Sequence, residues 1–502
     1  MSKVINRLLA VALLMVLAWV FYIFADANLY HYTANMESDT ASETLLAKVL
    51  YENGHTQPST WQMSTGRRII ASPMLASFLY PVTAFDLNAA MGLATTLMVV
   101  ALVGAMLFFN RQIGLSFLES MVAILLTFVL ATPESEIQRH IFLYAAYYTG
   151  HFICMFLVLG IYARALKKDK LPLIGIIVTV PLAIVNGMQG MHASMFFYMP
   201  LLGAEILRVI ALFIKKKKIN YKITSWVAII SLGSVVSFKV FGTHMVSDVS
   251  RNIRHAPEKF FDIVLPFCKS VLWYDRYPLL IALFVILAVL GYVLAITRLK
   301  DKPELWSALP IPFGVVVVIL STTFTTAESA PRYYMMQIFI VGVGTALLIH
   351  LFKPEKTMCL ALLVVFYGIT SAMAFDEALV KGDQMAFSAY EKVIAYMEEN
   401  GYEYGYSVFD YANMITVISN DKVKVRPVNS FAEMEGVKWL SDSTWYPPYK
   451  DPNGLTCYVV SEPKKEDFND FVKKQAPLII DSKELGVFTV YVTDRDYTVW
   501  VD

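Results

Sequence analysis

Apolar residues occur in long runs, separated by short polar segments, from the start of the chain to residue 375. A helix needs about 20 apolar residues to cross the roughly 30 Å hydrocarbon core of a bilayer, so each run predicts a transmembrane helix. Two of the runs are short. We expect about eleven helices, at residues 8–25, 87–109, 117–131, 143–166, 171–186, 193–214, 224–241, 278–296, 306–324, 333–352 and 358–375.

After residue 375 the pattern becomes that of a water-soluble α/β domain, covering residues 376–502. Residues 384–399 have an apolar helical face closed by Asn400-Gly401, which is typical of a helix C-cap. Because the segment has no nucleophile elbow, phosphate-binding glycine loop or metal-ligand spacing, we expect an accessory or acceptor-recognising domain. Strands are expected at 404–409, 423–428, 457–460, 477–480 and 486–492, and further helices at 411–419 and 466–474.

Composition agrees with a polytopic membrane protein, because 57% of the 502 residues are hydrophobic and only 17% are charged. The net charge of +1 provides no basic field for nucleic acid. The four cysteines are scattered without CxxC spacing, which indicates neither a disulfide framework nor a zinc site. Ala25-Asp26-Ala27 resembles a signal-peptide cleavage site, but the preceding run is too long, so we expect an uncleaved anchor.

Lysine and arginine collect in alternate loops, including Lys167 to Lys170 and Lys215 to Lys218. Positively charged loops are retained in the cytoplasm, so these loops and the N-terminus are expected there. The opposite, extracytoplasmic side then carries the long first loop at residues 26–86, shorter loops near 133–140, 186–192, 242–277 and 328–332, and the domain after 375.

The first outer loop contains an acidic cluster with Glu37, Asp39 and Glu43, followed by a short amphipathic stretch that ends at Asn53-Gly54. The stretch predicts a helix along the membrane surface. One interpretation is structural: Asp39 caps this helix, or Thr40 does so with Glu43 as its partner. The other is catalytic, because a carboxylate at this position stands where a lipid-borne substrate could meet it.

The second outer loop contains Glu134, Glu136, Arg139 and His140. Tyr144, Tyr147, Tyr148 and His151 follow at helical spacing, so one helix face would carry an aromatic stripe that lines a sugar-binding groove or forms an interfacial belt. Glu134 or Glu136 could join Asp39 around a divalent cation, although the spacing does not require a metal and no cofactor is certain.

Cations near the outer membrane boundary are candidates for binding a phosphate. The strongest is Arg332, in Arg332-Tyr333-Tyr334, because a guanidinium matches phosphate geometry; snorkelling to the interface is its alternative role. Lys239, near the outer end of its span, is expected to face a cavity or partner. The other candidates are Arg67, Arg68, Arg139 with His140, Arg251 and Arg254, and weaker cavity-lining candidates are His192, Asn186, Gln189, His244, Asp248 and His255.

A first span followed by a large outer loop that opens with an Asp beside a surface helix resembles the GT-C membrane glycosyltransferases. In Ser38-Asp39-Thr40-Ala41-Ser42-Glu43, Asp39 matches the first acid of the family motif, and Ser72-Pro73-Met74-Leu75 is similar to the entry of the next membrane-associated helix. Thr40 departs from the motif, because it stands where a second acid is expected; Glu37 or Glu43 would have to substitute for it.

The resemblance implies a GT-C-like catalytic domain at residues 1–375, in the plasma membrane of a prokaryotic cell. It also implies inverting sugar transfer from a polyprenyl-phosphate donor to an extracytoplasmic glycan, lipid or protein, with Asp39 as general base. The expected substrate-binding residues are Glu43, Arg67, Arg68, Glu134, Glu136, Arg139, His140, Tyr144, Lys239, Arg332 and Tyr333.

Three alternatives remain open at the level of sequence. A lipid-linked glycan polymerase or ligase has a related topology. A transporter or flippase of envelope lipids usually binds near the midplane between structural repeats, whereas here the polar groups lie at the outer ends and no repeat is apparent. A non-catalytic sensor would leave the acids of the first loop without a role.

Overall fold

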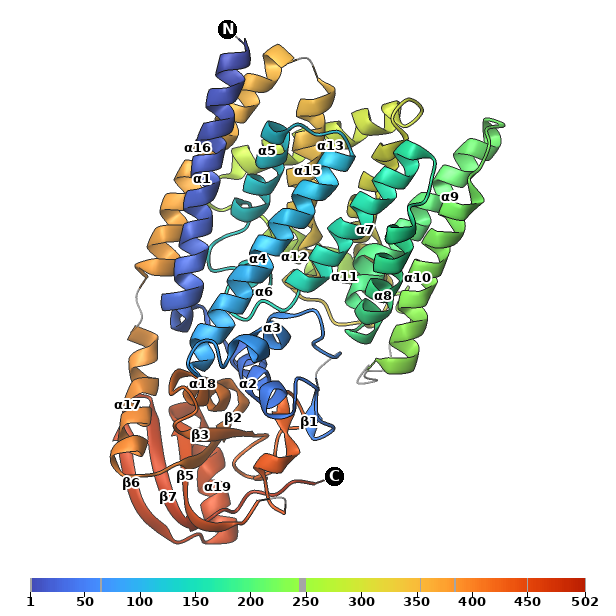
Figure 1. The fold of residues 1–502 in the computed structure, drawn as a ribbon. Helices are drawn as coiled ribbons and strands as arrows, with labels where there is room; N and C mark the ends of the chain where they lie inside the picture. Colours follow the sequence, from blue (N-terminus) through green and yellow to red (C-terminus); the bar gives the residue numbers. More distant parts are fainter. Residues whose placement is uncertain are drawn as a thin grey trace.

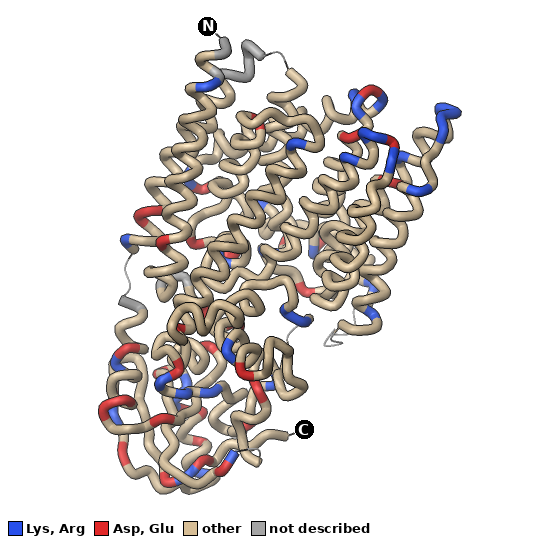
Figure 2. The backbone as a smooth tube through the Cα atoms, in the orientation of Figure 1, with Lys and Arg blue, Asp and Glu red and all other residues tan. Residues whose placement is uncertain are grey.

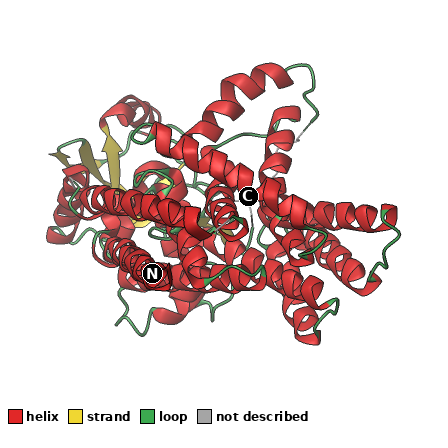
Figure 3. Ribbon diagram, turned by 90° about the horizontal axis from the view of Figure 1, so that it is seen from above, coloured by secondary structure: helices red, strands yellow, loops and turns green. Residues whose placement is uncertain are grey.

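The computed structural model describes residues 2–63, 66–242, 250–352, 354–382, 385–448 and 450–501. Helices form a long bundle, and the C-terminal residues form an α/β unit at one end of it (Figure 1). A view turned by 90° shows helices throughout the bundle, with the strands at one side (Figure 3). Within the described residues, nine helices are long and apolar enough to cross a membrane, and two shorter apolar helices accompany them.

These helices confirm the predicted membrane architecture, with shifted boundaries. Their first member begins earlier and ends later than expected, and the helix expected from residue 143 begins at Thr149. The main membrane helices are α1 (Ser2–Tyr30), α4 (Leu87–Gln112), α5 (Phe117–Val129), α7 (Thr149–Lys168), α8 (Leu173–Met188), α9 (Met199–Ile214), α10 (Tyr221–Phe241), α13 (Pro278–Arg298), α14 (Pro310–Phe324), α15 (Met336–Leu351) and α16 (Pro354–Phe375).

Neighbouring helices approach closely at glycines, because the absence of a side chain lets their backbones come into contact. A Cβ on Gly291 of α13 would lie 1.9 Å from the carbonyl oxygen of Gly344 on α15, and one on Gly92 of α4 would lie 2.1 Å from that of Asn28 on α1. Small residues at such crossings are typical of membrane helices, because packing between helices replaces the hydrophobic effect as the driving force.

Short helices lie between the bundle and the C-terminal unit: α2 (Ser38–Glu52), α3 (Ser72–Leu79) and α6 (Glu136–Ile141). The apolar face of α2 is buried, with Leu45, Leu46 and Leu50 at most 2% exposed. It packs in one core with residues of α4 and of α18 (Phe409–Ile418), including Met414 and Val417. The predicted amphipathic helix is therefore confirmed, but its expected place along the membrane surface is wrong, because its apolar face packs against α4 and α18.

The C-terminal unit is a mixed sheet in the order β3-β2-β5-β7-β6, with β2, β3 and β5 parallel and the rest antiparallel. Helices α17 (Met385–Glu399) and α18 contribute to one apolar core, and α19 (Lys465–Gln475) contributes to another. The α/β class and the five expected strands are confirmed. The strands are β2 (Tyr404–Val408), β3 (Lys424–Val428), β5 (Asn453–Ser461), β6 (Ile479–Leu485) and β7 (Phe488–Arg495).

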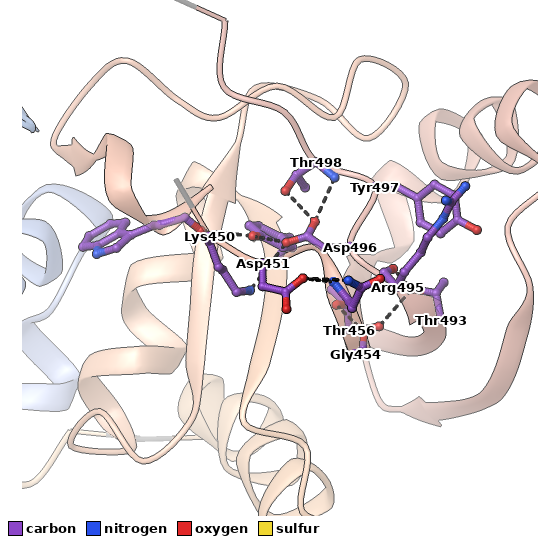
Figure 4. A network of polar contacts seen from close by, with 12 residues as sticks. Lys450, Asp451, Gly454, Thr456, Thr493, Arg495, Asp496, Tyr497 and Thr498 are labelled. Carbon is purple, nitrogen blue, oxygen red and sulfur yellow. Dashed lines mark hydrogen bonds and ion pairs between the residues drawn. The ribbon is translucent and has the colours of Figure 1, made fainter. Parts of the chain in front are cut away.

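Buried polar contacts fix the end of the chain onto this sheet (Figure 4). The Asp496 carboxylate accepts hydrogen bonds from the Tyr406 hydroxyl at 2.6 Å and from the backbone N–H and hydroxyl of Thr498 at 2.8 and 2.6 Å. Lys450 Nζ lies 3.5 Å from the same carboxylate. A carboxylate with this many donors is fully compensated, which indicates a structural role.

The C-terminal unit also docks onto the first loop. Asn413 of α18 donates a hydrogen bond to the Ser42 hydroxyl of α2 at 2.7 Å, and Asn88 of α4 donates to the carbonyl of Val417 at 2.8 Å. Strand β1 (Trp61–Gln62) pairs with β4 (Ser441–Asp442), and Lys48 forms an ion pair with Asp421. The helix that begins with the acidic cluster is thus held from both sides.

Candidate active site

Side chains from four segments meet where the bundle faces the C-terminal unit. They are the first turns of α2, the segment before α3, α6 with the loop that follows it, and the 3-10 turn at Pro331–Tyr334. These segments contribute Asp39, Arg68, Glu136 and Arg332, whose charges influence one another. The packing of the helices therefore brings together residues that are up to about 290 positions apart in the sequence.

Asp39 lies in the first turn of α2 and does not cap it. The N-cap residue is Glu37, whose backbone N–H donates to the Thr40 hydroxyl at 2.9 Å, and that hydroxyl donates back to the Glu37 carbonyl. Capping by Asp39, or by Thr40 with Glu43, is therefore wrong. Asp39 is half-buried and makes no hydrogen bond or ion pair with the described part of the chain.

Burial raises the pKa of the Asp39 carboxyl above its ordinary value, since a desolvated carboxylate is less stable than its neutral form. Arg332 opposes this shift, Glu43 adds to it, and Arg68 opposes it. The pKa of Glu37 is also raised, first by burial. A carboxylate with a raised pKa is a stronger base than an exposed one, which suits proton abstraction.

Three guanidinium–carboxylate pairs surround this unpaired acid. Arg68 lies 2.6 Å from Glu43, with both side chains buried, and Arg332 forms an ion pair with Glu136. Arg139 Nε lies 3.5 Å from Glu37, at a geometry that leaves Nε without a hydrogen bond among the described residues. Each arginine has five N–H donors, so the pairs leave donors for a further anionic ligand.

Aromatic rings form one wall of the site. The Arg68 guanidinium lies 4.9 Å from the centroid of the Tyr147 ring, and that of Arg332 lies 5.6 Å from the Tyr333 ring. The Tyr148 hydroxyl is 3.5 Å from His192 Nε2, and the His192 and Tyr333 rings are 5.8 Å apart. These contacts place Tyr333 and His192 beside the charged pairs.

Both histidines of the site are uncharged at neutral pH. Burial, followed by the positive charge of Arg332, lowers the pKa of His140 to about 3. Burial likewise lowers the pKa of His192 to about 3. His140 Nδ1 lies 2.7 Å from the carbonyl oxygen of Glu136, whereas its buried Nε2 has no hydrogen-bond partner among the described residues.

The predicted aromatic stripe is wrong as a helix face, because α7 begins at Thr149 and residues 144–148 form a turn with Ala145 at φ +59°. The turn separates the tyrosines: Tyr147 and Tyr148 reach the charged pairs, but Tyr144 points elsewhere. Tyr144 is fully buried, stacks on Tyr32 at 5.2 Å and donates to Asn88 Oδ1 at 2.7 Å.

Several predicted site residues lie away from this cluster. Lys239 is exposed in the last turn of α10, so the expectation of a shielded lysine is wrong. Arg67, Arg251 and Arg254 are also exposed, and His255 lies beside Glu258. His151 and Gln189 instead lie next to the cluster: they contact Asn186 at 3.0 and 3.5 Å, and Gln189 Oε1 accepts the backbone N–H of Ile69, beside Arg68, at 3.0 Å. His244 and Asp248 lie outside the described residues.

The expected divalent cation involved Asp39 with Glu134 or Glu136. In the structure Glu136 is engaged by Arg332, and Glu134 lines a separate cavity. Within the described ranges, no group of three or more His, Cys, Asp or Glu side chains is arranged to hold a metal ion. The metal stays a prediction without a ligand set in the described residues.

Comparison with known proteins identifies the fold. No protein-family model and no curated protein matches the sequence. The structure is similar to the crystal structure of ArnT from Cupriavidus metallidurans bound to undecaprenyl phosphate, with a TM-score of 0.56 and 12% sequence identity over 95% of this chain and 97% of that chain. The expected fold, a multi-pass helical membrane bundle with a C-terminal α/β unit, is confirmed, and this chain shares its fold with that protein.

Proposed function

We propose that this protein is a membrane glycosyltransferase that moves a sugar from a polyprenyl-phosphate donor to a hydroxyl of an extracytoplasmic glycan, lipid or protein. The observation that carries the proposal is the unpaired, half-buried Asp39 among three guanidinium–carboxylate pairs. A fold shared with a protein whose structure contains undecaprenyl phosphate supports the class of donor.

In the proposed reaction, Asp39 accepts the proton of the acceptor hydroxyl as its oxygen attacks the anomeric carbon of the donor sugar. The bond from that carbon to the phosphate oxygen breaks, its electron pair stays on the phosphate, and the anomeric carbon is inverted. A positioned general base accelerates such a step about 10² to 10⁴-fold. Free N–H donors of Arg332 and Arg68 would stabilise the charge that develops on the phosphate.

The charge distribution supports an extracytoplasmic site. Lysines and arginines gather on loops at the end of the bundle opposite the C-terminal unit (Figure 2), including Lys167 to Lys170 and Lys215 to Lys218. By the positive-inside rule that end is cytoplasmic, so the Asp39 end faces outward in the plasma membrane of a prokaryotic cell. The polyprenyl donor and the acceptor would meet there.

The test is an Asp39→Asn variant of the full chain in lipid nanodiscs, supplied with polyprenyl-phosphate sugars and washed envelope acceptors. Transfer should fall about 10² to 10⁴-fold, because the amide cannot accept the proton. Crosslinking to a photoreactive undecaprenyl phosphate should remain. The matched control is Glu52→Gln, an exposed acid at the other end of α2, which should transfer normally. Undiminished transfer by Asp39→Asn would remove Asp39 as the base.

A further inference from the structure

A cavity of about 730 Å³, lined by both polar and apolar residues, lies beside the Asp39 site. Its walls come from the loop before α6, from α6 itself, from the segment before α13 and from the helical turn after α16. The residues that decide its chemistry are Glu134, Arg139, Trp273, Arg276 and Glu377. Pockets for small ligands usually have volumes of about 300 to 1,000 Å³, so this cavity is large enough for a ligand.

The cavity walls carry equal numbers of positive and negative side chains, and most of these side chains have no ion-pair partner within the described part of the chain. The lining includes two guanidinium groups, of Arg139 and Arg276, and two carboxylates, of Glu134 and Glu377. Arg276 is 5.3 Å from the Trp273 ring and 5.4 Å from the Tyr277 ring, and these rings orient its guanidinium. Glu134, Arg276 and Glu377 form no ion pair with the described residues. Strong donors and strong acceptors are therefore both available to a ligand.

Arg139 connects the cavity to the Asp39 site. Its side chain lines the cavity. Its Nε also lies 3.5 Å from the carboxylate of Glu37, which is the N-cap residue of α2. Glu37 and Asp39 are close enough for each to affect the other electrostatically. Arg139 therefore belongs both to the cavity lining and to the cluster around Asp39, so a ligand in the cavity would lie next to that cluster.

We infer that this cavity binds the sugar headgroup of the acceptor; the inference rests on the proposed function. Sugar hydroxyls donate to carboxylates and accept from guanidinium groups, so a neutral wall with both kinds of group suits a polyhydroxylated ligand. A phosphate is disfavoured, because Glu134 and Glu377 form no ion pair with the described residues and would repel it, whereas each glutamate of the Asp39 cluster is paired with an arginine.

Protection from chemical labelling tests the site without a transfer assay. Ala378 lines the cavity and is partly exposed, so an Ala378→Cys variant, with Cys268→Ser and Cys359→Ser, should react with a maleimide. Oligosaccharides released from the source cell envelope should slow that reaction, whereas inorganic phosphate and undecaprenyl phosphate should not. The control is Lys381→Cys, which lies nearby but does not line the cavity and should be unprotected.

Kinetics provide the second test. Arg276→Ala and Glu377→Gln should each raise the KM for envelope acceptor about tenfold, equivalent to about 1.4 kcal/mol, and leave the KM for donor unchanged. Lys381→Ala should change neither constant, because its partner Asp376 lies outside the cavity lining. An unchanged acceptor KM in both variants would overturn the assignment.

The outcomes separate this inference from the proposed function. Protection by undecaprenyl phosphate, and not by oligosaccharide, would make the cavity a donor site and overturn the inference. Absence of protection by either, in a protein that transfers sugar, would also overturn it. Protection by oligosaccharide in a protein that neither transfers sugar nor crosslinks to undecaprenyl phosphate would support a glycan site and reject the glycosyltransferase.

Discussion

Two regions of this protein are built from paired arginines and glutamates, but their polar atoms are satisfied to different degrees. Inside the bundle, the Glu205 carboxylate of α9 accepts hydrogen bonds from Arg208 Nε at 2.7 Å and Nη2 at 2.6 Å, and it also accepts from the hydroxyls of Tyr162 at 2.5 Å and Thr224 at 2.6 Å. At the end of the bundle, Asp39 has no such partner, and Glu43 Oε2 and His140 Nε2 are buried without hydrogen bonds among the described residues.

The difference indicates which cluster holds the fold and which is available for chemistry. When every oxygen and N–H of a buried network has a partner, the network rigidifies the helices that contribute to it. Buried polar atoms without partners lower the stability of the folded protein, and such atoms are often found at functional sites. Their presence around Asp39, Arg68 and Arg332, here called the outer cluster, is therefore typical of a functional site. The predictions below use this contrast.

The largest effect on stability is expected inside the bundle. Glu205→Ala removes the carboxylate that compensates Arg208, and leaving one charge of a buried pair alone costs about 3 to 5 kcal/mol. Thermal unfolding in detergent micelles should show a clear loss of stability. A Glu205→Leu and Arg208→Leu double variant should recover most of it, since both charges are then absent. A stable Glu205→Ala protein would contradict the structural role.

The next effect is expected at the outer cluster. Arg332→Ala removes donors proposed to bind the phosphate, and hydrogen bonds to charged groups contribute about 1.5 to 3 kcal/mol each. The KM for polyprenyl-phosphate sugar should therefore rise by about one to two orders of magnitude. Arg298→Ala, at an exposed helix end on the opposite side, is the control. Equal donor KM values in the two variants would exclude Arg332 from the donor site.

The pH dependence of sugar transfer tests whether Asp39 is unpaired and desolvated. Asp39 must be ionised to accept a proton, and its pKa is raised by burial. The rate should accordingly fall as pH decreases through that raised pKa, by about tenfold per pH unit below it. The midpoint should lie above the ordinary aspartate value in a profile of transfer under saturating donor. A midpoint at or below the ordinary value would contradict an unpaired, desolvated Asp39.

The smallest expected effect is on stability at Asp39 itself. Its pKa is higher in the folded protein than in the unfolded chain, so its contribution is favourable below the unfolded pKa and is lost as pH rises through the folded pKa. Asp39→Asn should then be slightly more stable than the wild type at neutral pH, and the difference should disappear in acid. Thermal unfolding at both pH values measures it. A less stable variant would indicate a structural carboxylate.

Much of the fold could be predicted because its signals are local. Long apolar runs located the membrane helices, and alternating short segments located the strands of the C-terminal unit, with boundaries that differ by a few residues. The helix after Asp39 ended at Asn53, as the Asn53-Gly54 signal indicated. The exception is residues 144–148, where aromatic spacing favoured a helix but the chain turns.

The site could be predicted only in part. Asp39, Arg68, Glu136, Arg139 and Arg332 were selected from the sequence, and the structure brings them together. Their pairings depend on helices distant in sequence, as Arg332 with Glu136 illustrates. Arg276 and Glu377, which line the cavity inferred to bind the acceptor, were not selected from the sequence. The signal available for Arg276 was its place between the aromatic residues Trp273 and Tyr277.

The amino-acid sequence by itself determined that this is a multi-pass membrane protein with a C-terminal α/β unit, because hydropathy and periodicity act within one segment. Only the tertiary structure decided that Thr40 and Glu37 cap α2, that the arginines of the outer cluster are paired, and that Asp39 is left unpaired. The physical reason is that burial and charge compensation depend on which segments pack together, and packing is a property of the whole chain.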